Sequence, residues 1–121
     1  MGIMEDKIRK TFERRQFAKL RTLHDAENNR LLQMKHEYSR LPDGEILIPY
    51  KNAHATYYIY ENGIQKSVKS SEPVVDKLMR KRVLKRAITM QEAWCRSLGD
   101  AEKSFRRRMK SMEKSGPGKT L

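Results

Sequence analysis

The residues with the clearest chemical potential form a cationic run in the second half of the chain. Six of the ten residues from Lys77 to Arg86 are basic. Lys77, Lys81 and Lys85 are spaced four apart, so a helix would place them on one face beside its apolar stripe. Arg82 and Arg86 would line the other margin of that stripe. Neighbouring like charges destabilise a helix by roughly 0.2–0.5 kcal/mol per pair, so helix formation alone does not explain this run.

The net charge of the chain indicates a polyanionic partner for these cations. The formal charge is +12; residues 1–60 hold 11 basic and 8 acidic side chains, and residues 61–121 hold 16 basic and 7 acidic ones. Duplex DNA carries about one charge per 1.7 Å, so a lysine row can contact several phosphates. The asymmetry therefore favours either nucleic acid, DNA before RNA, or an anionic membrane surface. An acidic protein partner and a solvated helix with no partner are the alternatives.

A second cationic run lies near the end of the chain, in the segment FRRRMK. Arg106, Arg107 and Arg108 are candidates for the same phosphate contacts. Basic amphipathic helices also bind membrane surfaces or calmodulin-like proteins. The apolar side of this helix relies on one Phe and two Met, which does not favour a membrane partner.

Two tyrosines supply possible base-stacking groups. In the segment TYYIYENG, the expected hairpin register places Tyr58 and Tyr60 on one face of the sheet together with Lys69. Exposed aromatic rings on such sheets stack on unpaired bases. Cross-strand stabilisation of an open sheet face would also explain these tyrosines.

The remaining reactive residues do not form a catalytic or metal-binding constellation. His24, His36 and His54 lack metal-ligand spacing, and Cys95 lies beside an apolar stripe, as buried inert thiols do. The segment GPGKT resembles a phosphate loop, but Glu113 stands where that motif needs its first glycine. We therefore predict no enzymatic activity, no cofactor and no bound metal.

Composition places the protein in a reducing compartment without a membrane span. Its single cysteine excludes an internal disulfide, and the start MGIMEDKIRK is too charged for a signal peptide. No apolar run approaches the roughly 20 residues that a membrane helix needs. We expect a cytoplasmic protein.

The first element that must position these groups is a long helix. Residues 4–41 contain no glycine or proline, and the segment Leu41–Gly44 should end the helix. Its apolar residues share one stripe: Ile8, Phe12, Leu20, Leu23, Leu31, Met34, Tyr38 and Leu41. A second helix must cover this stripe, either from the same chain or from a second copy, so a homo-oligomer through the first helix is possible.

A small antiparallel sheet should follow over residues 44–70. The segment 45–50 alternates and contains Pro49, which predicts an edge strand. The Asn62-Gly63 pair predicts a hairpin between 56–61 and 64–69, because both turn residues need positive φ. The resulting register puts an apolar group on the face that covers a helix: Tyr57, Ile59, Ile64 and Val68.

The basic region 72–114 should be one long or broken helix, followed by a disordered tail over 115–121. Its expected apolar stripe is Val75, Met79, Val83, Ala87, Met90, Trp94 and Leu98. Gly99 can end a helix in a left-handed conformation, and Asp100 can cap a last one. Phe105, Met109 and Met112 would lie on the apolar side of that last helix.

Short motifs across residues 20–95 resemble a group of uncharacterised bacterial proteins of the Firmicutes type, in their N-terminal region. The matching positions are Leu41, Pro42, Gly44, Asn52, Tyr57, Tyr58, Gly63, Leu78, Lys81 and Leu84. The longer members look restriction-endonuclease-like, with the nuclease-like part downstream. This chain ends where that part would begin, so the resemblance implies a binding or scaffolding region without its nuclease.

Together these observations predict an α+β fold: a long N-terminal helix, a small antiparallel three-stranded sheet, and a basic C-terminal helix. The leading functional hypothesis is a non-enzymatic nucleic-acid-binding module that uses the basic helix and the open face of the hairpin. The alternative hypothesis is a helical protein-interaction or oligomerisation module whose basic face is only solvated.

Overall fold

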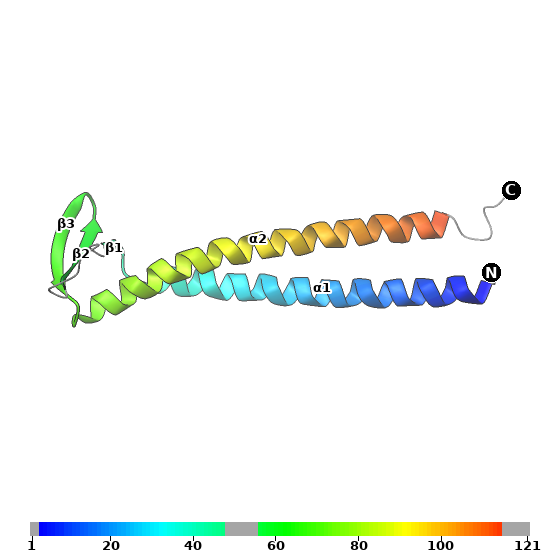
Figure 1. The fold of residues 1–121 in the computed structure, drawn as a ribbon, viewed down its shortest axis with the longest axis horizontal. Helices are drawn as coiled ribbons and strands as arrows, with labels where there is room; N and C mark the ends of the chain where they lie inside the picture. The colour runs from blue at the N-terminus through cyan, green and yellow to red at the C-terminus, as the bar shows by residue number, and fades with distance from the viewer. Residues whose placement is uncertain (1–2, 48–55, 115–121) are drawn as a thin grey trace. The chain divides into compact units, whose positions relative to one another are not determined.

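The computed structural model describes residues 3–47 and 56–114 and confirms the α+β class (Figure 1). The elements in chain order are α1 (Ile3–Arg40), β1 (Glu45–Leu47), β2 (Thr56–Glu61), β3 (Ile64–Lys69) and α2 (Pro73–Lys114). The chain divides into two compact units. Residues 1–30 and 91–121 form the helical unit, and residues 31–90 form the sheet unit. The predicted tail over 115–121 lies outside the described residues.

The bounds of α1 follow from local chemistry. Glu5 and Asp6 lie in its first turn, where negative charge is favourable next to the helix dipole. The helix ends at Arg40, immediately before the predicted stop at Leu41–Gly44. Gly44 has a φ of 108°, and a Cβ added there would lie 3.3 Å from the backbone oxygen of Tyr60. Only glycine adopts this conformation readily, so the chain can turn from α1 into the sheet.

The sheet has the predicted register and the strand order β1-β2-β3. Tyr57 lies opposite Val68, and Ile59 lies opposite Lys66. Asn62 and Gly63 have φ values of 51° and 78°, as a tight hairpin turn requires. β1 is an edge strand, as predicted. Its expected continuation through Pro49 lies outside the described residues.

One face of the sheet covers the beginning of α2. Ile46, Ile59, Val75 and Leu78 form the buried core of the sheet unit. Half-buried neighbours pack against this core: Tyr57, Val68, Val74 and Met79. The buried face and the open face of the hairpin are therefore divided as the register predicts.

Ile64 departs from the predicted apolar face, because its side chain is 59% exposed. A short turn ties the other end of β3 to α2, in which the Glu72 N–H donates to the Lys69 carbonyl at 3.0 Å. Ile64 lies five residues away, or about 17 Å along an extended strand. In Figure 1 this turn end of the hairpin lies away from α2. The prediction that Ile64 belongs to the core is wrong because α2 does not extend beneath it.

The predicted apolar stripe of α2 is confirmed in part: Val75 and Leu98 are buried, and Met79 and Ala87 are half-buried. Val83, Met90 and Trp94 are 62%, 73% and 45% exposed. The buried residues that this stripe did not include are Leu78, Leu84 and Cys95. The sequence of α2 carries apolar residues on more than one side, and α1 is a single partner helix. It can cover only one of these sides, so the other remains exposed.

The predicted helix break at Gly99 is also wrong, because α2 is continuous from Pro73 to Lys114. Glycine inside a helix costs roughly 1 kcal/mol relative to alanine, which packing can offset. Gly99 lies against the imidazole of His24, where an added Cβ would be 3.5 Å from His24 Cε1. His24 therefore lies beside Gly99 at a distance that would leave room for a Cβ, and Asp100 does not cap a new helix.

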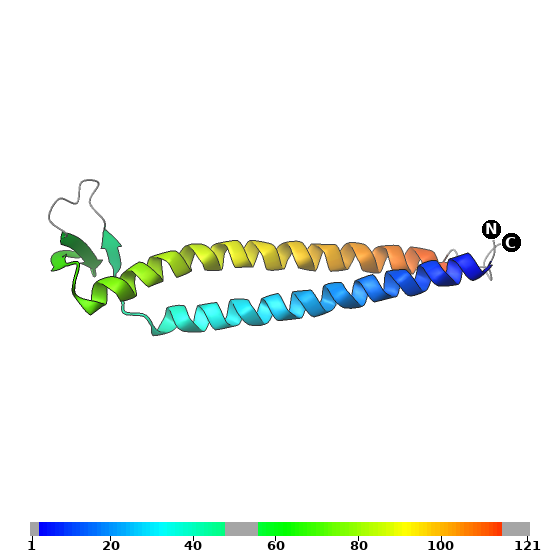
Figure 2. The same cartoon turned by 60° about the horizontal axis from the view of Figure 1, so that its bottom comes forward.

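In the helical unit, α1 and α2 lie side by side and antiparallel in both views (Figures 1 and 2). The rings of Phe17 and Phe105 are 6.5 Å apart. The α1 residues on the half-buried side are Glu13, Phe17, Leu20, His24 and Glu27. Their steps of four and three residues are those of a coiled-coil contact.

Part of the predicted α1 stripe faces solvent. Ile8, Phe12 and Leu23 are 65%, 58% and 41% exposed. The contact side of α1 in the helical unit includes Glu13, His24 and Glu27. A search for periodic apolar residues does not find these polar side chains. The polar residues are accommodated because α2 supplies partners for them, and the apolar pattern alone did not identify this side.

Candidate nucleic-acid interface

The predicted site residues fall into separate groups. Lys77, Lys81, Arg82, Lys85 and Arg86 lie on α2 in the sheet unit, together with Tyr58, Tyr60 and Lys69 of the sheet. Arg106, Arg107 and Arg108 lie in the helical unit.

The ammonium group of Lys81 makes contacts within the protein. Its side chain is half-buried, and Nζ donates a hydrogen bond of 3.0 Å to the carbonyl oxygen of Pro42. The same ammonium lies 5.3 Å from the ring centroid of Tyr38. A cation is also favourable close to the C-terminus of α1, where unpaired carbonyls gather. Lys81 therefore connects α2 to the end of α1, and the lysine row is not one continuous surface.

Arg80, next to Lys81, is also engaged. Its Nη2 donates to Glu37 Oε1 at 2.9 Å and to Glu37 Oε2 at 3.0 Å, and its Nε donates to Oε1 at 3.2 Å. Forked contacts of this kind hold arginine in a fixed orientation. Both groups are exposed, so the pair contributes little to stability, but it offsets one positive charge.

The other cations of α2 in the sheet unit lie on either side of Arg80 and Lys81 in the sequence. Lys77, Arg82, Lys85 and Arg86 are exposed, and their side chains make no hydrogen bond or ion pair to another described residue. Arg82, Lys85, Arg86 and Thr89 occupy positions i, i+3, i+4 and i+7, which share one helical face. We call these four residues the basic face. It is about 10 Å long along the helix axis and carries three unpaired positive charges.

The predicted aromatic surface exists as an open sheet face. Tyr58 pairs with Leu47 on β1 and with Ser67 on β3, and Tyr60 is 46% exposed. Lys69 is exposed at the end of β3. Because neighbouring residues in a strand point to opposite faces, Tyr58 and Tyr60 point away from the face that packs on α2. A ligand flat on this face would not touch the basic face without passing round a sheet edge.

Two of the three arginines in the segment FRRRMK have intramolecular partners. Arg108 Nη2 is 3.0 Å from Glu13 Oε2, and its guanidinium lies 4.5 Å from the ring centroid of Phe105. Arg106 lies 5.8 Å from the centroid of Phe17 and 3.9 Å from Glu102. Arg107 is exposed and makes no such contact to a described residue. This run therefore serves largely to hold α2 against α1.

Sequence reasoning missed the polar contacts on the packed side of the helical unit. His24 Nδ1 is 3.0 Å from Glu102 Oε1. Gln91 Nε2 donates to the backbone oxygen of Glu27 at 3.0 Å and to its carboxylate at 2.5 Å. A possible signal was the spacing of His24 and Glu27, which continues the three- and four-residue steps from Phe17 and Leu20.

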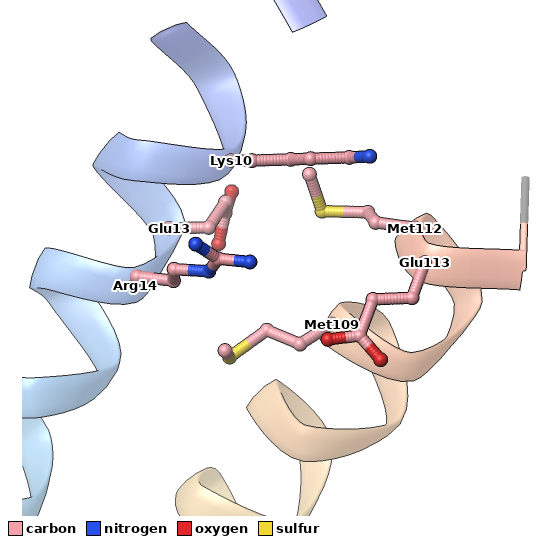
Figure 3. Close-up of a pocket in the computed structure, with 6 residues that line it drawn as sticks. All are labelled: Lys10, Glu13, Arg14, Met109, Met112 and Glu113. Atoms are coloured by element: carbon pink, nitrogen blue, oxygen red, sulfur yellow. The ribbon is translucent and has the colours of Figure 1, made fainter. Parts of the chain in front are cut away.

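A small pocket in the helical unit is lined by charged and methionine side chains (Figure 3). Its lining residues are Lys10, Glu13, Arg14, Met109, Met112 and Glu113. Its volume is about 10 Å³, close to the space of one water molecule. Glu13 Oε2 is buried there and is close to Arg108 without the geometry of a hydrogen bond. The pocket is too small for an organic ligand.

Metal-binding clusters and membrane-crossing helices were also sought among the residues that the structure describes. Among the described residues, no cluster of three histidine, cysteine or acidic side chains could hold a metal ion. Within the same ranges, neither helix has an apolar stretch that would cross a membrane. Comparison with protein-family models, curated proteins and solved structures gave no match. The resemblance to Firmicutes-type proteins stays a prediction.

Proposed function

We propose that the protein is a non-enzymatic nucleic-acid-binding module that contacts phosphates, DNA before RNA, through the basic face of α2. The observation that supports this most strongly is the set of exposed, unpaired charges on Arg82, Lys85 and Arg86. Other cations in the sheet unit, Arg80 and Lys81, are held by intramolecular partners. Charges that are left without partners on a rigid helix are available to a polyanion.

Binding of this kind releases counterions and depends strongly on salt. Each phosphate contact contributes about 0.9 to the slope of log K against log salt concentration for duplex DNA. The basic face offers three cations within about two turns of helix, so its share of the slope is roughly two to three. Such contacts position the protein on the backbone without reading the base sequence.

The test is a fluorescence-anisotropy titration of duplex probes across a salt series. Replacing Arg82, Lys85 and Arg86 together by Gln should lower the slope by roughly two to three. The matched control replaces Lys103, Arg107 and Lys110 by Gln, which removes the same charge from exposed positions of the helical unit. An equal drop in both variants would show diffuse attraction to the whole chain, and no binding by the unaltered protein would refute the proposal.

A second candidate function, helical oligomerisation, is supported by a different observation. Met4, Ile8 and Phe12 are spaced four apart on α1 and are 76%, 65% and 58% exposed. Leu31 and Met34, further along α1, are half-buried inside the sheet unit, so they offer less exposed apolar surface for such a contact. Sedimentation equilibrium should show a dimer that Ile8→Gln with Phe12→Gln converts to monomer; a monomeric unaltered protein would exclude this function.

A further inference from the structure

A second exposed apolar row lies on α2, next to the basic face. Val83, Ala87 and Met90 occupy positions i, i+4 and i+7, so they line up along the helix. Val83 and Met90 are 62% and 73% exposed, and Ala87 between them is half-buried. We call these three residues the outer row. Single exposed apolar residues are common, but an aligned row with a small residue at its centre suits the approach of another helix.

The charges beside the outer row define what could cover it. Arg82 and Arg86 border the row, each immediately preceding one of its members in the sequence. Both are exposed and have no ion-pair partner among the described residues. From Lys77 to Gln91 the chain contains no acidic residue. Any helix that covers Val83 and Met90 must therefore meet unpaired positive charge along its edge.

The outer row of a second copy of this chain does not meet that requirement. In a two-fold antiparallel pairing centred on Ala87, the Arg86 side chains of the two copies would approach each other. Like charges across a helical contact are destabilising, and residues 77–91 contain no carboxylate to offset them. Nucleic acid does not meet the requirement either, because it offers phosphates to the arginines but no apolar surface for Val83 and Met90.

We propose that the outer row is a docking site for an amphipathic helix of a partner protein, with an apolar stripe bordered by Asp or Glu. Val83 and Met90 pack into that stripe, and Ala87 lets the two helices approach. Arg82 and Arg86 pair with the acidic border, as flanking charges do in coiled coils. This site goes beyond the proposed nucleic-acid binding but shares two arginines with it, so the partner helix and DNA exclude each other.

The probe for this proposal is a synthetic three-heptad peptide with Leu at positions a and d and Glu at positions e and g. A scrambled peptide of the same composition has the same charge but no stripe. Calorimetric titration of the full chain should detect binding of the heptad peptide and not of the scrambled one. Equal affinity for both peptides would show that only their net charge matters, and this result would overturn the proposal.

Variants of the full chain locate the site. Val83→Gln with Met90→Gln should weaken peptide binding by about tenfold or more, the loss expected when about 1.4 kcal/mol of apolar contact is removed. Leu32→Gln with Ile64→Gln removes similarly exposed apolar side chains from α1 and β3 and should leave the affinity unchanged. Met90→Gln alone serves as a milder variant, and circular dichroism checks that α2 remains helical.

The outcomes separate this site from the proposed DNA site. Arg82→Gln with Arg86→Gln should weaken both peptide and duplex binding, whereas the Val83 and Met90 variant should weaken peptide binding only. Peptide binding without any DNA binding would refute the proposed function and leave this inference standing. Unchanged peptide affinity in the Val83 and Met90 variant would overturn the inference, whatever the protein does with DNA.

Discussion

Lys81 Nζ donates a hydrogen bond to the carbonyl oxygen of Pro42 at 3.0 Å, across 39 positions of the chain. The ammonium also lies over the ring of Tyr38, in the last turn of α1. This contact explains why Lys81 and Lys85, which look equivalent in the sequence, have different environments. Lys81 is half-buried against α1, and Lys85 is exposed on the basic face.

The first prediction compares these two lysines. Lys81→Gln should lower the free energy of unfolding by about 1–2 kcal/mol, because it removes a charged hydrogen bond and a cation–π contact. It should leave the salt slope of DNA binding nearly unchanged. Lys85→Gln should leave the free energy of unfolding nearly unchanged and lower the salt slope by about 0.9. Urea denaturation and salt-dependent titration of both variants test this prediction. If Lys81→Gln and Lys85→Gln changed the free energy of unfolding equally, Lys81 would not have a structural role.

The second prediction concerns the two faces of the hairpin. Ile59→Ala should cost about 2–4 kcal/mol of stability, because Ile59 is 9% exposed in the core. Tyr60→Ala should cost much less, since Tyr60 lies on the open face. Thermal melting of both variants measures the difference. Similar losses would mean that both faces of the sheet are covered.

The same tyrosine variant tests whether the sheet belongs to the interface. Because the open face points away from α2, Tyr60→Ala should leave the affinity for duplex DNA unchanged. The readout is parallel titration with duplex and single-stranded probes. A loss of about 1–3 kcal/mol with single-stranded probes alone would reveal stacking of bases on the open face, with Tyr58 as its neighbour.

The third prediction uses two glycines in contrasting environments. Gly99→Ala should stabilise the protein by about 0.5–1 kcal/mol, because alanine favours the helix and its Cβ would make an ordinary contact with His24. Gly44→Ala should destabilise it, because a φ of 108° is unfavourable for alanine and the Cβ would crowd the backbone of Tyr60. Chemical denaturation of both variants gives the sign of each change in the free energy of unfolding. A destabilised Gly99→Ala variant would show that the helix is too tightly packed at this position for a Cβ.

The fourth prediction distinguishes adjacent arginines in the helical unit. Arg108→Gln should destabilise the protein by about 1 kcal/mol, because Glu13 is mostly buried and would lose its cation. Arg107→Gln should change stability little, since that side chain is exposed and unpaired. Thermal unfolding of the two variants under the same conditions is the measurement. Equal behaviour would mean that the Arg108–Glu13 contact does not contribute to stability.

Parts of the interface could be anticipated and parts could not. The basic residues of α2 are visible in the sequence, and so are the tyrosines of the hairpin. The sequence did not reveal which cations are already paired, because Glu37 and Pro42 lie far from Arg80 and Lys81 along the chain. The polar contacts of His24 and Glu27 were hidden for the same reason: an apolar pattern does not identify polar residues that acquire partners only on packing.

The sequence by itself determined the local geometry. Asn62-Gly63 set the hairpin and with it the register that separates Tyr57 from Tyr58, because few residue pairs tolerate positive φ at both positions. Pro42 and Gly44 ended α1 for equally local reasons. Only the tertiary structure decided which side of α2 is covered, because more than one side carries apolar residues. Leu84 is buried, Lys81 contacts the end of α1, and α2 remains helical through Gly99. Val83 and Met90 remain exposed, since one partner helix covers only one side of α2.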